Sequence, residues 1–112
     1  MTTPEGLVKK SIKDFLAEYD IQPAKAAGTF TTAAGWYFMP TTAGLGVKGI
    51  PDFLGHYLGV FFGIETKAPG KKPSGFQALQ IAAIEQSGGA VFVVDGPETL
   101  KVFERWLVAV RS

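Results

Sequence analysis

The chain has 112 residues, which fits a single domain over residues 1–112. Hydrophobic residues make up 46% of the sequence, which argues against disorder, and the lack of cysteine excludes disulfides and thiolate metal sites. The net charge of +1 is too small to coat nucleic acid through bulk charge, so such contacts must come from local lysine clusters. The apolar runs are too short to span a bilayer and the first residues lack a signal-peptide core, so we expect a cytoplasmic protein without membrane contact.

The first predicted element is a helix over residues 4–19. Thr3 is suited to cap its N-terminus, with Pro4 at the first helical position. Apolar residues at helical spacing form one face, namely Val8, Ile12, Phe15, Leu16 and Tyr19. Glu5 lies three residues before Val8 and therefore at the N-terminal end of this face.

The next segment, residues 22–32, is expected to be irregular. Residues 36–39 are rich in aromatic side chains and predict a strand that ends at Pro40. We expect these aromatic side chains in the core rather than as a platform for stacked bases. Residues 41–49 contain three glycines and are expected to form a mobile loop.

The second half of the chain predicts an alternation of strands and helices. The expected elements are strands at 51–57 and 60–67, a loop at 68–72, a helix at 75–87 and a buried strand at 90–94. A last helix starts at residues 95–97, with one apolar face formed by Leu100, Phe103, Leu107 and Val110. The order α-β-β-β-α-β-α predicts an α/β domain with a mixed sheet, in which a strand joins an antiparallel meander through a helical crossover.

The strand over residues 60–67 carries an unusual pair of charges. Residues two apart in a strand point to the same side, so Glu65 and Lys67 share a face with Phe61 and Gly63. Residues 60, 62, 64 and 66 point the other way, into apolar packing. Charged side chains on such an apolar strand need a partner or a metal, because buried charge is costly.

Asp52 is placed by the symmetry of a hairpin. If strands 51–57 and 60–67 turn between Leu58 and Gly59, paired residue numbers add up to 117, although this dipeptide is not an ideal two-residue turn. Asp52 then lies opposite Glu65, with Cβ atoms roughly 5 Å apart. A shift of one residue would put the two carboxylates on opposite faces.

Two facing carboxylates repel each other unless a cation lies between them. Mg²⁺ suits one or two carboxylates together with waters and phosphate oxygens, and it can activate a water nucleophile. Lys67, on the same face, is suited to position that water or to neutralise the developing charge. These are the parts of a phosphodiester hydrolase.

The segments 48–52 and 63–70, with Gln77 and the Gly88-Gly89 pair further on, carry a family resemblance. Ile50-Pro51-Asp52 followed by Ile64-Glu65-Thr66-Lys67 resembles the motif of the PD-(D/E)XK nucleases. The wider frame, Lys48-Gly49-Ile50-Pro51-Asp52 and Gly63-Ile64-Glu65-Thr66-Lys67-Ala68-Pro69-Gly70, is similar to the VRR-NUC branch. The short motif is weak alone, and the extended one is more specific.

This resemblance implies a restriction-endonuclease-like PD-(D/E)XK core and an endonuclease that uses Mg²⁺ or Mn²⁺, with no organic cofactor. Asp52 and Glu65 would be metal ligands, with the Thr66 carbonyl and Glu5 as further ligands. Lys67 would be the catalytic base or charge stabiliser, and Gln77 would lie beside the site. Small stand-alone relatives resemble phage or bacterial proteins and dimeric junction nucleases, which implies DNA as substrate, a homodimer, and a bacterial or phage-infected host cell.

Each of these residues also has an ordinary structural interpretation. Asp52 could cap a turn, and Glu65 and Lys67 could form a solvated pair on an edge strand. Ser74 and Gln77 fit a capping box, and Glu5 could complement the helix dipole. The lysines expected to contact nucleic acid could equally be solvated, namely Lys48, Lys71 and Lys72.

The sequence therefore predicts a metal-dependent endonuclease acting on DNA, with junctions and flaps as candidate structures. The alternative is a catalytically inactive nucleic-acid-binding or accessory subunit with the same fold. An intact set of Asp52, Glu65 and Lys67 favours the enzyme.

Overall fold

The computed structural model describes residues 2–41 and 46–112. Part of the loop expected at 41–49 thus lies outside the described residues. Three helices are present in these ranges: α1 (Pro4–Glu18), α2 (Gly75–Gln86) and α3 (Pro97–Arg111). The strands are β1 (Ile21–Pro23), β2 (Gly35–Phe38), β3 (Phe53–Tyr57), β4 (Val60–Thr66) and β5 (Ala90–Val94), and a short 3₁₀ helix, η1 (Ala24–Ala26), follows β1.

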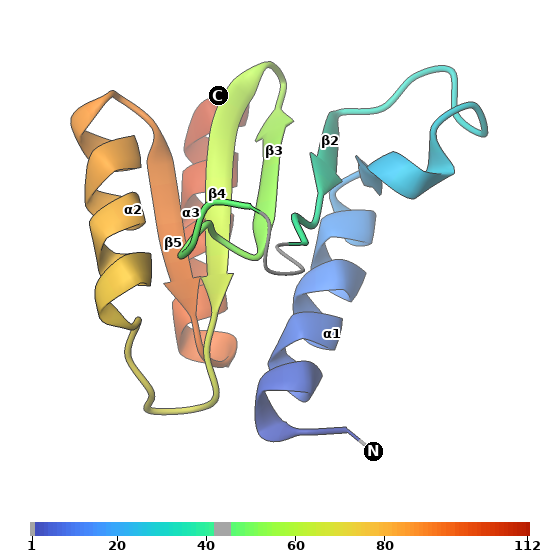
Figure 1. Ribbon diagram of the computed structural model, residues 1–112. Coiled ribbons are helices and arrows are strands. Elements are labelled where there is room, and N and C mark those ends of the chain that lie inside the picture. The colour runs from blue at the N-terminus through green and yellow to red at the C-terminus, as the bar shows by residue number, and fades with distance from the viewer. Residues whose placement is uncertain (1, 42–45) are drawn as a thin grey trace.

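The strands form one mixed sheet in the order β1-β2-β3-β4-β5 (Figure 1). β2, β3 and β4 form an antiparallel meander, whereas β1 runs parallel to β2 and β5 runs parallel to β4. The crossover from β4 to β5 passes through α2, as parallel pairing requires. The α/β class and the added strand predicted from the sequence are confirmed.

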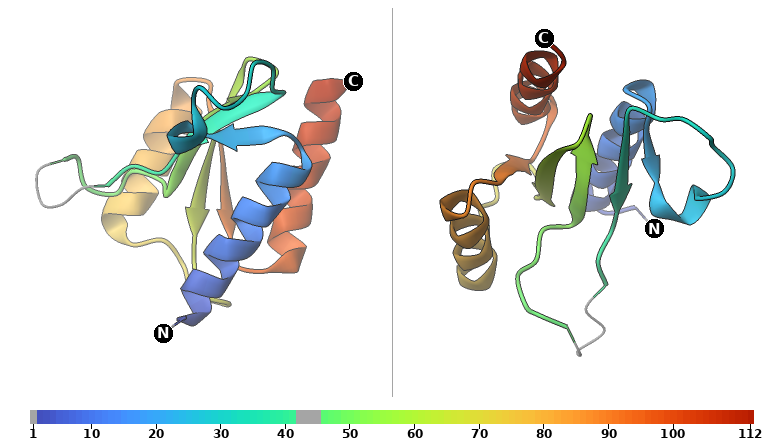
Figure 2. Two further views of the ribbon diagram at one scale, coloured as in Figure 1. Left: turned by 90° about the vertical axis from the view of Figure 1, so that its right-hand side faces the viewer. Right: turned by 90° about the horizontal axis from the view of Figure 1, so that it is seen from above.

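Helices cover the two faces of the sheet unequally (Figure 2). α1 and α3 pack on one face and enclose the hydrophobic core, where Ile12, Leu16 and Phe103 meet Phe62 and Ile64. α2 lies on the opposite face, over β4 and β5, and none of the helices in the described ranges covers the part over β2 and β3. None of the helices described is both long and apolar enough to cross a membrane.

The N-terminal cap of α1 forms as predicted. The Gly6 amide donates to the Thr3 hydroxyl at 3.0 Å, with Pro4 at the first helical position. Placing residues 22–32 wholly in irregular structure was wrong, because residues 21–23 form the edge strand β1 and residues 24–26 form η1. A three-residue strand ending in proline has too little alternation to be recognised, and its partner lies more than ten residues away.

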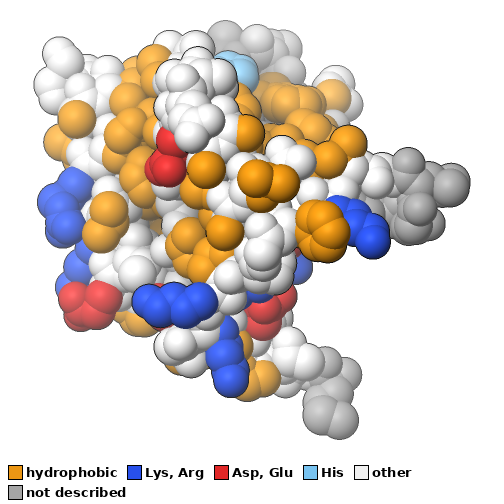
Figure 3. All heavy atoms as spheres, turned by 60° about the vertical axis from the view of Figure 1, so that its left-hand side comes forward, with side chains coloured by type: hydrophobic (Ala, Val, Ile, Leu, Met, Phe, Trp, Pro, Cys, Tyr) orange, Lys and Arg blue, Asp and Glu red, His pale blue; other side chains and the backbone are white. Residues whose placement is uncertain are grey.

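The aromatic strand β2 divides its side chains between two faces. Tyr37 belongs to the core, as predicted. Phe38 is 39% exposed and Trp36 is only partly buried, so placing both in the core was wrong. Their rings lie 5.6 Å apart, and both line a groove of about 420 Å³ on the face without a helix. Hydrophobic side chains are prominent over this side of the molecule (Figure 3).

Candidate active site

The β3–β4 hairpin brings Asp52 and Glu65 together. Its pairs run from Phe53 with Ile64 to Tyr57 with Val60, which confirms the predicted register. Leu58 and Gly59 both adopt positive φ, 51° and 83°, as a type I′ hairpin turn requires. The two-residue turn therefore forms, although leucine is unfavourable at positive φ. Asp52 is one residue before β3 and therefore falls opposite Glu65.

Asp52 is oriented by the backbone of the facing strand. The Thr66 amide donates a hydrogen bond to Asp52 Oδ2 at 2.9 Å, so the carboxylate continues the ladder just before β3 begins. The other oxygen, Oδ1, lies 3.9 Å from the Lys9 ammonium of α1. Helix α1 thus contributes a positive charge to the end of the sheet.

Glu65 is a buried carboxylate, and one of its oxygen atoms lacks a hydrogen-bond partner. Its side chain is only 1% exposed, and Oε1 has no hydrogen-bond partner among the described residues. The Lys67 ammonium lies 3.6 Å from Oε2. Burial, and secondly the negative charge of Asp52, raise the pKa of Glu65 to about 7, against the opposing effect of Lys67.

Thr66 carries a carbonyl at the same edge of β4. In an antiparallel pair, the N–H and C=O of one residue point toward the same neighbouring strand. Because the Thr66 amide bonds to Asp52, the Thr66 carbonyl also leaves β4 on the side of Asp52. The Thr66 hydroxyl is buried without a hydrogen-bond partner among the described residues.

The segment that leads into Asp52 packs against the N-terminus of α2. Gly49 has a φ of +84°, and a Cβ atom there would overlap the backbone of Phe76. The Lys48 ammonium lies 5.3 Å from the centre of the Phe76 ring, a cation–π arrangement. Glycine at position 49 is therefore required for the close contact between this segment and the helix.

Gln77 forms the capping box that was considered as its alternative role. The Ser74 amide donates to Gln77 Oε1 at 2.8 Å, and the Gln77 amide donates to the Ser74 hydroxyl. Its backbone also lies against Gly49, close to the segment that carries Asp52. The cap is therefore present, and a direct role of Gln77 in catalysis stays a prediction.

The loop after β4 is fixed at its base and exposed at its lysines. The Gly70 amide donates to Asp95 Oδ2 at 3.0 Å, and the Thr99 hydroxyl donates to Asp95 Oδ1 at 2.9 Å. Both hydrogen bonds lower the pKa of Asp95, and the bond from Gly70 has the larger effect. Lys71 and Lys72 are exposed on this loop, and their contact with phosphate stays a prediction.

The third carboxylate expected from the first helix does not join the other two. In the described ranges, no group of three or more histidine, cysteine, aspartate or glutamate side chains is placed to hold a metal ion. Glu5 lies in the first turn of α1 and does not complete such a group with Asp52 and Glu65. Any part that Glu5 plays as a ligand must therefore be indirect or follow a rearrangement.

The sequence-based interpretation missed Lys9. It lies next to Val8, which belongs to the buried face of α1, and its ammonium reaches Asp52. A charged residue four positions after Glu5 shares its side of a helix, and this spacing was the only indication available.

The donor set fits a small divalent cation. Asp52 and Glu65 supply two facing carboxylates, and the Thr66 carbonyl is directed to the same edge. The buried Oε1 atom of Glu65 lacks a partner, which is costly unless a proton or a cation compensates it. Two carboxylates suffice for Mg²⁺, which keeps several waters and takes phosphate oxygens from a substrate.

No protein-family model matches this chain. The search of curated proteins gives no match either. The resemblance to the VRR-NUC branch therefore rests on the motif residues alone.

Proposed function

We propose that this protein is a Mg²⁺- or Mn²⁺-dependent endonuclease that hydrolyses phosphodiester bonds in DNA. One observation carries the proposal: the buried Glu65 carboxylate, whose Oε1 atom has no hydrogen-bond partner among the described residues, faces Asp52 at the open end of the hairpin, with Lys67 beside its Oε2 atom. The mixed sheet, with its meander and helical crossover, agrees with a PD-(D/E)XK core of the VRR-NUC type, which is part of the proposal.

Asp52, Glu65 and the Thr66 carbonyl are the groups that would hold the cation. When bound, such an ion supplies Lewis-acid chemistry, lowering the pKa of an attacking water and drawing charge from the scissile phosphate. The Thr66 amide holds Asp52 in place for this role. The burial of Glu65 excludes bulk water from one side of the site, which strengthens electrostatic interactions there.

Lys67 and Lys9 would balance negative charge at the site. Lys67 is mostly buried, and its ammonium lies beside Glu65, so it can stabilise the negative charge that develops on the phosphate. Lys9 neutralises Asp52 from the side of α1 and holds its Oδ1 atom toward the helix. We assign Lys9 as a positioning residue because its contact is with Asp52.

The alternative function is a nucleic-acid-binding or accessory subunit without catalysis. Such a protein would gain nothing from a glutamate that is almost fully buried and lacks a hydrogen-bond partner for one oxygen. A buried charge of this kind lowers stability, and strongly shifted carboxyl pKa values cluster at catalytic sites. The geometry therefore favours the enzyme.

The substrate class can be tested with a panel of labelled DNA molecules. Duplex, flap, single-stranded and four-way-junction DNA are incubated with the protein and Mg²⁺ or Mn²⁺. We expect cleavage of at least one structure, no cleavage with EDTA, and recovery when the metal is restored. Tight, metal-independent binding of DNA without cleavage of any member would support the accessory subunit instead.

A further inference from the structure

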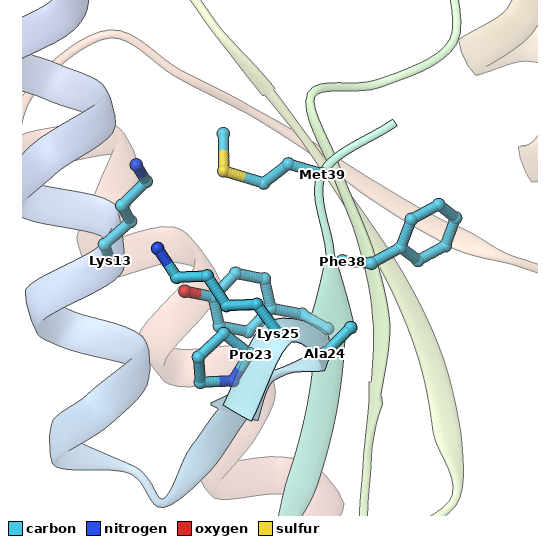
Figure 4. Close-up of a pocket in the computed structure, with 7 residues that line it drawn as sticks. Lys13, Pro23, Ala24, Lys25, Phe38 and Met39 are labelled. Atoms are coloured by element: carbon cyan, nitrogen blue, oxygen red, sulfur yellow. The ribbon is translucent and has the colours of Figure 1, made fainter. Parts of the chain in front are cut away.

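A second concave site lies between α1, η1 and the end of β2, and it is not part of the carboxylate centre. It is a cavity of about 260 Å³ (Figure 4). The residues that line it are Lys13, Pro23, Ala24, Lys25, Tyr37, Phe38 and Met39. This volume is slightly below the ~300–1,000 Å³ of sites for drug-sized ligands, so the cavity suits a small molecule or one terminal group.

The polar side of this cavity is cationic. Lys13 extends from α1 and Lys25 from η1 into the same space (Figure 4). No acidic side chain lines the cavity, and neither lysine forms a salt bridge within the described parts of the chain. Two positive charges that converge without a counter-charge favour an anion.

Tyr37 adds a hydrogen-bond donor to the two ammonium groups. Its side chain lines the cavity and is only 6% exposed, yet its hydroxyl makes no hydrogen bond with any described residue. Burial raises the pKa of this hydroxyl, so it keeps its proton. The hydroxyl is not among the fully buried atoms that lack a partner, so it is open to the cavity and free to donate a hydrogen bond to a ligand there.

The remaining walls are apolar. Pro23 and Met39 lie beside the cationic side and offer contacts to the organic part of a ligand, whereas the Phe38 ring points away from the lysines (Figure 4). The site therefore combines three hydrogen-bond donors, two of them charged, with an apolar surface.

We propose that this cavity binds a terminal phosphate monoester carried on a small organic group, such as the phosphate of a mononucleotide. A phosphate monoester carries about −1.5 to −2 charges at neutral pH and has three terminal oxygens. These match the two ammonium groups and the hydroxyl. A carboxylate carries only one negative charge, so it would leave one of the two ammonium groups without a counter-charge.

The cavity lies close to the carboxylate centre. Lys13 is four residues after Lys9 on α1, so the two share one side of the helix and are about 6 Å apart along its axis. The end of β2 also lies beside the start of β3, because Phe38 pairs with Leu54. The phosphate has two sources at this place: a free mononucleotide, or the phosphorylated end of a nucleic-acid strand.

The first experiment measures binding of deoxyadenosine monophosphate, deoxyadenosine and inorganic phosphate by calorimetry, with EDTA present. The test variant combines Lys13→Gln with Lys25→Gln, and the control combines Lys10→Gln with Lys101→Gln, two exposed lysines outside the cavity. We expect the wild type and the control to bind the monophosphate at least tenfold more tightly than the nucleoside. The test variant should lose about tenfold in affinity or more.

A second variant, Tyr37→Phe, keeps the ring in the core and removes only the hydroxyl. We expect it to fold, as circular dichroism can show, and to bind the monophosphate several-fold more weakly than the wild type. Equal binding of monophosphate and nucleoside by the wild type would overturn the proposal. Equal loss of affinity in the test and control variants would overturn it as well.

The second experiment separates the two sources. Binding of a single-stranded oligonucleotide with and without a 5′-phosphate is compared in EDTA, which prevents metal-dependent cleavage. A phosphate-dependent gain of tenfold that disappears in the Lys13 and Lys25 variant assigns the strand end. A gain seen only with the mononucleotide assigns a free small phosphate ester. Both experiments run without cleavage, so they stand even if the proposed nuclease activity fails.

Discussion

Replacing Glu65 by glutamine should stabilise the metal-free protein at alkaline pH, even though it removes a residue of the proposed active site. The substitution keeps the size of the side chain and removes its negative charge. Because Glu65 is buried and faces Asp52, its ionised form is unfavourable in the folded state. The variant never carries this charge.

The sign and size follow from the raised pKa of Glu65. The folded-state pKa of Glu65, about 7, exceeds its ordinary value of 4.5. Protonation of Glu65 therefore stabilises the folded protein. This stabilisation is fully present below pH 4.5 and is lost as the pH rises through 7. A difference of 2.5 pH units at 1.36 kcal/mol each gives a penalty of about 3 kcal/mol at high pH. For a domain of this size, that corresponds to roughly 10 °C in melting temperature.

The assay is thermal unfolding in EDTA at about pH 5 and about pH 9, with Glu85→Gln as an exposed control. We expect Glu65→Gln to melt close to the wild type at about pH 5, with a difference under about 1 kcal/mol, and well above it at about pH 9. The control should follow the wild type at both values. A Glu65→Gln protein that melts below the wild type at about pH 9 would refute the reasoning, because the buried charge would then be stabilising.

Other predictions concern the surroundings of the site. Gly49→Ala should destabilise the protein by about 1–3 kcal/mol, because a Cβ atom there overlaps Phe76 and φ is positive. The control Gly75→Ala has open space around the added Cβ atom and should not destabilise the protein. Equal melting temperatures of the two variants would contradict this prediction. Lys71→Ala with Lys72→Ala should weaken DNA binding and flatten the slope of log affinity against log salt concentration by about one unit per lost phosphate contact. An unchanged slope would show that both lysines are solvated loop residues without phosphate contacts. Light scattering at micromolar concentration should show a homodimer, which would double the few lysines available to hold DNA; a mass near 12.0 kDa with cleavage retained would show that one chain suffices.

The parts of the fold that depend on local patterns were predictable from the sequence. The hairpin register followed from the alternation in residues 60–67 and a two-residue connection, and it placed Asp52 opposite Glu65 without any knowledge of the rest of the sheet. The cap at Thr3 and the capping box at Ser74 are likewise local motifs, and both form.

The parts that depend on packing between distant elements were not predictable. β1 pairs with β2, whose residues lie more than ten positions later, and its three residues carry no pattern of their own. Alternation alone puts Trp36 and Phe38 opposite Tyr37, but it does not predict that their face is left uncovered by the helices described. The contact of Lys9 with Asp52 depends on how α1 crosses the end of the sheet.

The burial of Glu65 is also a tertiary property. The sequence indicated a charged residue on an apolar strand, but the extent to which water is excluded from Glu65 follows only from tertiary packing. That burial raises the pKa of Glu65 and leaves its Oε1 atom without a partner. The observation that carries the proposed function therefore comes from the structure.

The most direct test of the central claim is single-turnover cleavage of the best DNA substrate in Mg²⁺ by the wild type and by Asp52→Ala, Glu65→Ala and Lys67→Ala. Each variant is first shown to be folded, with Glu85→Ala as an exposed control. We expect the control to cut at the wild-type rate and each of the three site variants to lose nearly all activity, because residues that act as a unit fail together. Cleavage by Lys67→Ala or Glu65→Ala at the wild-type rate would contradict the assignment of this site.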